Sequence, residues 1–218
     1  MSLFDSRFYD FNVHPQGPNS IARMAFEAKR RGYSGMAVIN STISGDLPGD
    51  FSIYAGIEIK ARPSGLREEI KKHRGSSVIL IVIGGNEELT RAAVETEGLD
   101  ILLQPAEFNN VLAKAASDNS IALGFDLGSL IHLRGEVRVR ELMNMRTNLK
   151  YARKYDLSMI LTSNAHSIFD IRSPREMEAL SRLFGMKPEE AVKAMSSNPL
   201  GILRRKSPDY IQEGIEIL

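Results

Sequence analysis

The chain lacks cysteine, long hydrophobic runs and a sizeable net charge, and each absence narrows the possibilities. Without cysteine it forms no disulfide, thiolate zinc site or cysteine nucleophile, which fits a reducing intracellular compartment. No apolar run approaches the roughly 18 residues of a membrane span, and the amino terminus lacks the apolar core of a signal peptide. The formal net charge is +1, so the average charge indicates no nucleic-acid or membrane partner. We therefore expect a soluble, cytoplasmic protein.

Signatures of common catalytic mechanisms are also scarce. Gly84-Gly85 follows a strand-like run but lacks the spacing of a dinucleotide fingerprint or a P-loop. No serine lies in a nucleophile-elbow context, and no His-Asp-Ser order can be defended. Any function must therefore be sought in other residues.

The sequence does contain a regular alternation of short apolar runs and helix-like segments over its 218 residues. The expected strands cover residues 8–13, 35–39, 51–60, 78–83, 101–103, 121–126 and 157–161, with a possible last strand at 214–218. The expected helices cover residues 21–31, with an N-cap at Asn19 or Ser20, then 66–73, 87–96, 109–117, 136–155 and 174–184, before two short helices starting near Pro188 and Pro199. About seven β/α alternations without a repeat or linker predict an α/β fold with one domain over residues 1–218. The favoured architecture is a TIM-barrel-like (β/α) barrel of seven or more parallel strands with outer helices.

One stretch, residues 157–175, has the form that α/β folds use for chemistry. Its apolar run ends in Thr162, Ser163, Asn164 and His166, and Ser173-Pro174-Arg175-Glu176 then has the pattern of a capping box at the start of a helix. A polar, histidine-bearing strand end in front of a capped helix is a candidate active site. An ordinary exposed loop with one histidine is the alternative.

In a barrel, the carboxyl ends of the strands meet at one rim, and the polar residues expected there can be listed. They are Asn12, His14, Asn40, Glu58, Gln104, Asp126, Asn164 and His166. Four strands contribute an amide, which is a poor ligand for zinc or manganese and cannot act as a general base. The amide surplus argues against catalysis, so we predict no catalytic residue and no metal site in this chain.

Charge is unevenly distributed along the sequence. Residues 134–154 contain seven basic residues against two acidic ones, whereas residues 86–100 contain one basic residue against five acidic ones. Basic helix faces are usually only solvated, but here the cations are closely spaced, which makes phosphate binding a serious alternative. The candidate RNA-binding residues are Arg134, Arg138, Arg140, Arg146, Lys150, Arg172, Arg175, Arg204 and Arg205.

Several segments together resemble a known family. They are residues 8–14 (FYDFNVH), 98–102 (GLDIL), 149–155 (LKYARKY), 161–167 (LTSNAHS) and 172–176 (RSPRE). The pattern is similar, across nearly the whole chain, to the family of protein component 3 of archaeal ribonuclease P, the counterpart of a thirty-kilodalton subunit of the eukaryotic enzyme.

The resemblance implies a barrel of the polymerase-and-histidinol-phosphatase (PHP) superfamily that works as a subunit of a tRNA-processing ribonucleoprotein. In that enzyme the ribonuclease P RNA, with Mg²⁺, removes the 5′ leader from precursor tRNA. The protein would bind no cofactor itself, would pair with a small partner subunit in a two-plus-two assembly, and would help the RNA to fold and act. Alone it would not be catalytic.

The superfamily also offers an explanation for the amides. Its active phosphoesterases carry metal-binding histidines and carboxylates at positions that correspond here to a partly substituted set: Asn12, His14, Asn40, Glu58, Gln104, Asn164 and His166. The resemblance implies that these residues are the remnants of a lost metal site. A metal-dependent phosphoesterase of the PHP class is the alternative function, motivated by the surviving His14, Glu58 and His166.

Overall fold

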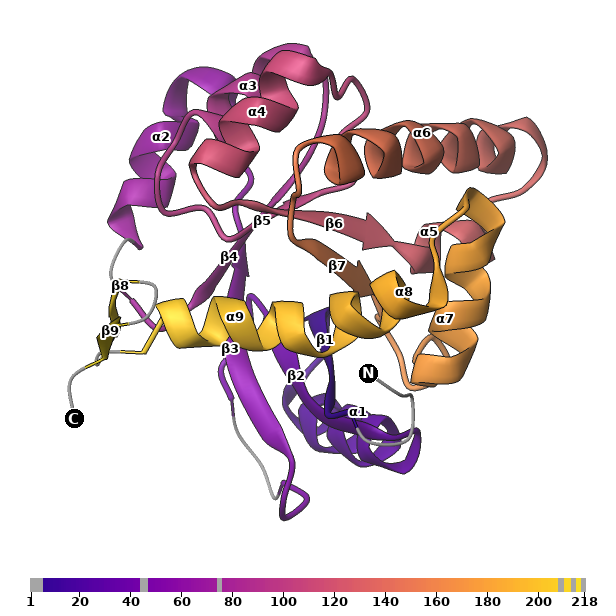
Figure 1. Cartoon of the computed structure of the whole chain (residues 1–218). Coiled ribbons are helices and arrows are strands. Elements are labelled where there is room, and N and C mark those ends of the chain that lie inside the picture. Colours follow the sequence, from indigo (N-terminus) through magenta and orange to yellow (C-terminus); the bar gives the residue numbers. More distant parts are fainter. Residues whose placement is uncertain (1–5, 44–46, 74–75, 208–209, 213–214, 217–218) are drawn as a thin grey trace.

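Seven parallel strands form one curved sheet in which each strand pairs with the next along the sequence (Figure 1). The computed structural model describes residues 6–43, 47–73, 76–207, 210–212 and 215–216. The strands are β1 (Phe8–Val13), β2 (Tyr33–Ile39), β3 (Ser52–Glu58), β4 (Ile79–Ile83), β5 (Ile101–Leu103), β6 (Ala122–Asp126) and β7 (Met159–Thr162). The predicted α/β barrel is confirmed.

Helices surround the sheet on its outer side. They are α1 (Pro18–Arg30), α2 (Pro63–Lys72), α3 (Glu87–Val94), α4 (Asn110–Asp118), α6 (Gly135–Lys154), α7 (Pro174–Ser181) with the 3-10 turn η1 (Arg182–Phe184), and α8 (Pro188–Met195). Their apolar faces pack on the outward side chains of the strands in the larger of two hydrophobic clusters. Most strands are buried on both faces over most of their length, which explains continuous apolar runs such as ILIVI in β4, whereas β3 is largely half-buried.

The second hydrophobic cluster fills the inside of the barrel. Its buried members include Phe11 of β1, Ile81 of β4 and Ile202 of α9 (Ser197–Arg205). The α9 helix lies across the amino-terminal end of the strands, where Asn198 donates a hydrogen bond of 2.8 Å to the Met159 carbonyl. Because α9 covers this end, the carboxyl ends of the strands form the other, uncovered end of the barrel.

The barrel closes between β1 and β7 through a short seam that contains a buried carboxylate. The backbone contributes one parallel bridge, between Val13 and Ala165. Beside it Asp10, which is 3% exposed, accepts hydrogen bonds from the hydroxyls of Thr162 at 2.6 Å and Ser163 at 2.5 Å, and from the Ser163 amide at 3.1 Å. Burial raises the pKa of Asp10. A polar cluster thus joins the first and last strands of the barrel.

Two helices differ from the expectations. The N-cap of the first helix is Gly17, not Asn19 or Ser20, and the helix begins at Pro18; the Ser20 hydroxyl lies inside the first turn and donates to the Gly17 carbonyl. A short helix, α5 (Leu127–His132), was missed, and the Asp126 carboxylate caps it by accepting a hydrogen bond from the Ser129 amide.

The last expected strand is present in part. The chain forms a short antiparallel pair of β8 (Tyr210–Gln212) and β9 (Ile215–Glu216), of which β8 was not predicted. The rest of the predicted range 214–218 lies outside the described residues.

Candidate functional site

Most of the predicted rim residues lie together near the seam, joined by hydrogen bonds between side chains. His14 Nε2 lies 2.9 Å from Asn12 Oδ1, and the Asn12 amide donates to Asn164 Oδ1 at 3.2 Å. The Asn164 amide in turn donates to Asp126 Oδ2 at 2.9 Å. This chain of contacts links the carboxyl ends of β1, β7 and β6.

The other two amides, Asn40 and Gln104, hold neighbouring strand ends in a different way. Each comes directly after a strand in left-handed conformation, with φ of 51° and 49°, and Asn164 has φ of 47°. Asn40 Oδ1 accepts a hydrogen bond from the Glu58 amide at 3.2 Å, and Gln104 Oε1 accepts one of 3.4 Å from the Asp126 amide. These side chains therefore extend the hydrogen bonding of the sheet by one step at the rim.

The remaining ionisable groups of the rim form a compact cluster. Glu58 is buried, and its carboxylate lies 2.8 Å from Lys60 Nζ and 3.9 Å from His14 Nε2. The rings of His14 and His166 stack with centroids 4.6 Å apart. The pKa of His14 is lowered by burial first and then by the charges of His166 and Lys60, against the opposing effect of Glu58. These effects together favour the neutral form of His14.

Asp126 and Glu141 form a pair of neighbouring carboxyl groups at the rim. Burial raises the pKa of Asp126, and burial followed by the charge of Asp126 raises the pKa of Glu141 on α6. Gln104 has a smaller, opposing effect that lowers the pKa of Glu141. Glu141, Lys60 and Asp10 were not among the rim residues predicted from the sequence. Two signals were available in the sequence: Asp10 is a single acidic residue within an apolar strand, and Lys60 follows Glu58 by two residues.

The described side chains at the rim do not form a set of ligands that fits a metal ion. Over the part of the chain that the structure describes, no group of three or more histidine, aspartate or glutamate side chains is arranged to hold a metal. Asn164 lies between Asp126 and Asn12, and Lys60 neutralises Glu58. The rim residues are thus committed to one another and to the strand ends.

The nine predicted RNA-binding cations share one electrostatic property. Among the described residues, none of them lies within ion-pair distance of a carboxylate, whereas many other cations do, for example Arg31 with Glu27 and Arg153 with Glu190. Five of the nine donate to backbone carbonyls: Arg134, Arg138, Arg146, Arg172 and Arg205. The side chains of the other four are exposed or nearly so, with no hydrogen bond to a described residue: Arg140, Lys150, Arg175 and Arg204. Their positive charge is uncompensated.

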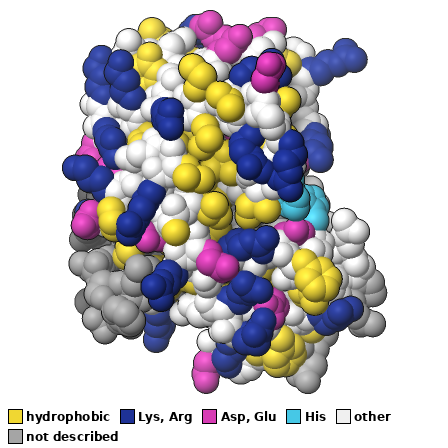
Figure 2. Space-filling view, turned by 90° about the vertical axis from the view of Figure 1, so that its right-hand side faces the viewer, with side chains coloured by type: hydrophobic (Ala, Val, Ile, Leu, Met, Phe, Trp, Pro, Cys, Tyr) yellow, Lys and Arg dark blue, Asp and Glu magenta, His cyan; other side chains and the backbone are white. Residues whose placement is uncertain are grey.

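The structure does not bring these nine cations into one patch. Arg134, Arg138, Arg172 and Arg175 lie near the carboxyl-terminal end of the barrel, around the starts of α6 and α7. Arg204 and Arg205 lie at the opposite end, where Arg205 contacts the Ser120 carbonyl before β6. The α6 helix connects the two ends, since its 20 residues span roughly 30 Å. Figure 2 shows Lys and Arg side chains spread among exposed hydrophobic ones over one face of the molecule.

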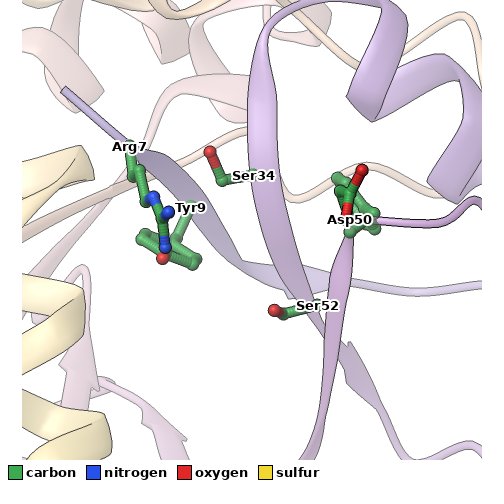
Figure 3. A pocket seen from close by; sticks show the side chains of 6 residues that line it. Arg7, Tyr9, Ser34, Asp50 and Ser52 are labelled. Carbon is green, nitrogen blue, oxygen red and sulfur yellow. The ribbon is translucent and has the colours of Figure 1, made fainter. Parts of the chain in front are cut away.

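The described residues line hollows at both ends of the barrel. One hollow of about 370 Å³ lies at the starts of β1, β2 and β3 and is lined by Arg7, Tyr9, Ser34, Asp50, Phe51 and Ser52. Figure 3 shows Arg7 lying beside the Tyr9 ring at this hollow. Burial is the main cause that raises the pKa of Tyr9, and Arg7 partly offsets this increase. The other region lies at the carboxyl-terminal end, along α1.

Fold and rim together define a class of protein: a parallel β/α barrel whose rim is built from mutually hydrogen-bonded amides and carboxylates, with unpaired cations on its outer helices. A family model described as RNase P subunit p30 matches residues 7–208. A protein of Methanococcoides burtonii named ribonuclease P protein component 3 is 44% identical over 99% of this chain and 95% of its own length. A protein of the same name from Methanothermobacter thermautotrophicus is 32% identical, over 97% and 96% of the two chains. The chain belongs to the RNase P subunit p30 family, which confirms the resemblance.

Solved structures agree on the fold. A chain of a structure described as archaeal ribonuclease P with mature tRNA matches with a TM-score of 0.78 at 23% identity, over 95% of this chain and 97% of that chain. The ochratoxinase of A. niger matches with a TM-score of 0.64 at 13% identity, over 97% of this chain and 75% of that chain. Among the described residues, none of the helices has the length and apolar character that a bilayer crossing requires.

Proposed function

We propose that this chain acts in ribonuclease P as an RNA-contacting protein subunit, supporting an RNA that removes the 5′ leader of precursor tRNA. Its family and the names of its relatives support this role. The chain would contribute positioning and charge neutralisation, while the RNA with Mg²⁺ would supply the chemistry. A small partner subunit, a two-plus-two assembly, a single-domain chain and a cytoplasmic location are parts of the same proposal.

The observation that carries the RNA contact is the outward face of α6. Val139, Met143, Arg146 and Lys150 follow one another at spacings of four, three and four residues, so they lie in one row. Val139 and Met143 are 55% and 59% exposed, and Lys150 has no partner among the described residues. Cations without carboxylate partners are free to neutralise phosphates, because no existing ion pair must be broken. The apolar half of the row favours contact with the protein partner.

Charge reversal on α6 tests the proposal. The double variant Arg140→Glu, Lys150→Glu reverses Lys150 of this row and the exposed Arg140, which directly follows Val139. It should weaken binding to the catalytic RNA and raise the Mg²⁺ concentration needed for 5′ cleavage in a reconstituted enzyme. Because two phosphate contacts are lost, the slope of log affinity against log salt should fall by about 1 to 2. The matched control is Arg67→Glu, Lys71→Glu on α2, which makes the same charge change at exposed positions without described partners. If both double variants bind and stimulate equally, α6 does not contact the RNA.

The alternative function is a metal-dependent phosphoesterase, motivated by the proximity of His14, Glu58 and His166. It is less favoured because Lys60 already pairs with Glu58 and because the neighbouring amides are weak ligands. Elemental analysis of the purified chain discriminates between the two functions. Stoichiometric zinc or manganese, together with hydrolysis of a phosphate ester that is lost in His14→Ala, would favour the alternative.

A further inference from the structure

A groove runs along α1 at the carboxyl-terminal end of the barrel, and nothing in the proposed contact of α6 uses it. One part of it, about 270 Å³, is lined by Gln16, Ser20, Arg23, Met24, His166, Ser167, Ile168 and Phe169. The adjoining part, about 440 Å³, is lined by Arg23, Phe26, Glu27, Arg30 and Ile168. Because Arg23 and Ile168 line both parts, the two hollows adjoin each other, and we call them together the α1 groove.

Two exposed phenyl rings stand at the α1 groove. Phe169 is 78% exposed and Phe26 is 53% exposed. Such exposure of a large apolar ring is costly in water, since burial of an aromatic side chain is normally favourable. Phe26 and Arg23 are three residues apart on α1, so they lie on the same side of the helix, and Phe169 faces the groove from the loop between β7 and α7.

The loop that carries Phe169 is held in place by several hydrogen bonds. Arg172 donates to the Phe169 carbonyl at 2.6 Å. The Asp170 carboxylate accepts from the Ser167 hydroxyl at 2.8 Å and from the His166 amide at 3.2 Å. The fold therefore positions an exposed aromatic ring on an ordered loop, which lowers the conformational cost of using that ring to bind something.

The charge of the α1 groove is positive. Arg23 is exposed and has no partner among the described residues. The acidic residue that lines the groove, Glu27, is neutralised by two arginines, Arg30 at 2.7 Å and Arg31 at 2.6 Å. An uncompensated arginine between two aromatic rings matches the chemistry of single-stranded nucleic acid, in which flat bases alternate with phosphates.

We propose that the α1 groove binds an unpaired stretch of RNA, with a base stacked on Phe169, a second base against Phe26 and a phosphate at Arg23. This inference rests on the proposed function, because it assumes that the chain works on RNA. It adds a second RNA contact that differs in kind from the first. The α6 row would neutralise phosphates whatever their base sequence, whereas the α1 groove would select strands whose bases are free to stack.

The test uses the full chain and a short single-stranded oligoribonucleotide that carries 2-aminopurine, whose fluorescence falls when it stacks on an aromatic ring. Wild-type protein should bind the single strand and quench it, and should bind the corresponding duplex more weakly at this site. Phe169→Ala should lower the affinity roughly 5- to 150-fold and abolish the quenching, since that is the range found for loss of one stacking ring. Phe169→Trp keeps an aromatic surface and should retain both signals.

Salt dependence separates stacking from charge. Phe169→Ala should leave the slope of log affinity against log salt unchanged, whereas Arg23→Gln should reduce it by about 0.7, the value for one phosphate of a single strand. Both positions are exposed, so melting temperatures should remain at the wild-type value and report on folding. Unchanged quenching and affinity in Phe169→Ala would overturn the proposal. So would a variant that keeps RNA affinity but loses association with a protein subunit of the complex.

The same variants in reconstituted ribonuclease P distinguish the two failures. If Phe169→Ala is silent while the α6 double variant still loses stimulation of cleavage, the groove inference alone is wrong. If neither variant affects RNA binding or cleavage, the proposed function of the chain as an RNA-contacting subunit fails with it.

Discussion

Replacing Asp10 tests whether a buried carboxylate closes the barrel. In the Asp10→Asn variant, one side-chain oxygen can still accept the hydrogen bond from the Thr162 hydroxyl, but the new amide group turns a donor toward the buried Ser163 amide. A buried backbone N–H that loses its acceptor costs about 1 to 3 kcal/mol. Part of this loss is offset because the neutral side chain avoids burying a charge, so we expect Asp10→Asn to cost about 2 kcal/mol. Asp10→Ala removes both oxygens and should cost roughly 3 to 5 kcal/mol.

Urea unfolding at pH 7 measures these losses. The midpoint should fall while the m-value stays constant, because the surface exposed on unfolding hardly changes. Native-state hydrogen exchange adds a local readout: the His14 amide, which donates to the Ala165 carbonyl at 2.8 Å across the seam, should lose protection in both variants.

A double-mutant cycle supplies the decisive control. Ser163→Ala removes one donor to Asp10, and combining it with Asp10→Ala should cost less than the sum of the two single losses, by roughly 0.5 to 3 kcal/mol. If Asp10→Ala alone costs under about 1 kcal/mol, or if the two substitutions are additive, the carboxylate does not hold the seam and the backbone bridge suffices.

Two further ion pairs give stability predictions of different size. The hydrogen bonds from Arg30 and Arg31 lower the pKa of Glu27 to about 2 from 4.5, so its contribution to stability is complete above pH 4.5 and is lost as the pH falls through about 2. In urea unfolding we expect Glu27→Gln to cost about 1 kcal/mol at pH 7, because solvent screens the pair. The cost should shrink on acidification to about pH 3, and a constant cost would contradict the assignment. Lys206 pairs with Asp100 at 2.7 Å where both side chains are nearly buried, so Lys206→Met should cost about 3 kcal/mol, and a loss under about 1 kcal/mol would refute this.

The strands were predictable from the sequence for a simple reason. Strands buried on both faces must be apolar without interruption, and residues such as 79–83 and 101–103 leave little alternative. The α5 helix was missed because it has only six residues and follows a strand directly, so its start was assigned to the strand end at Asp126. That residue serves as the last residue of β6 and as the N-cap of α5. A sequence pattern that assigns each residue to a single element cannot show that Asp126 both ends a strand and caps a helix.

The seam and the groove could not be predicted, because both depend on contacts between distant parts of the chain. Asp10 and Ser163 are separated by 153 residues and meet only once the five intervening strands, β2 to β6, have set the curvature of the sheet. The basic residues stay a prediction as RNA contacts, and the sequence could not show which of these arginines also hold carbonyls. Arg138, for instance, donates to the Leu133 carbonyl at 2.8 Å and fixes the end of α5.

The structure shows what the amides at the rim do. In the sequence, the resemblance to the phosphoesterases implies only that metal-binding residues have been replaced at these positions. In the fold, Asn164 donates to Asp126 at 2.9 Å and accepts from Asn12 at 3.2 Å, and only a group that is both donor and acceptor can do this without an ion. An aspartate at this position would place two carboxyl groups in direct contact, which would require a shared proton or a cation between them. The amides thus join the carboxyl ends of β1, β6 and β7 through side-chain hydrogen bonds, and this network helps to close the rim.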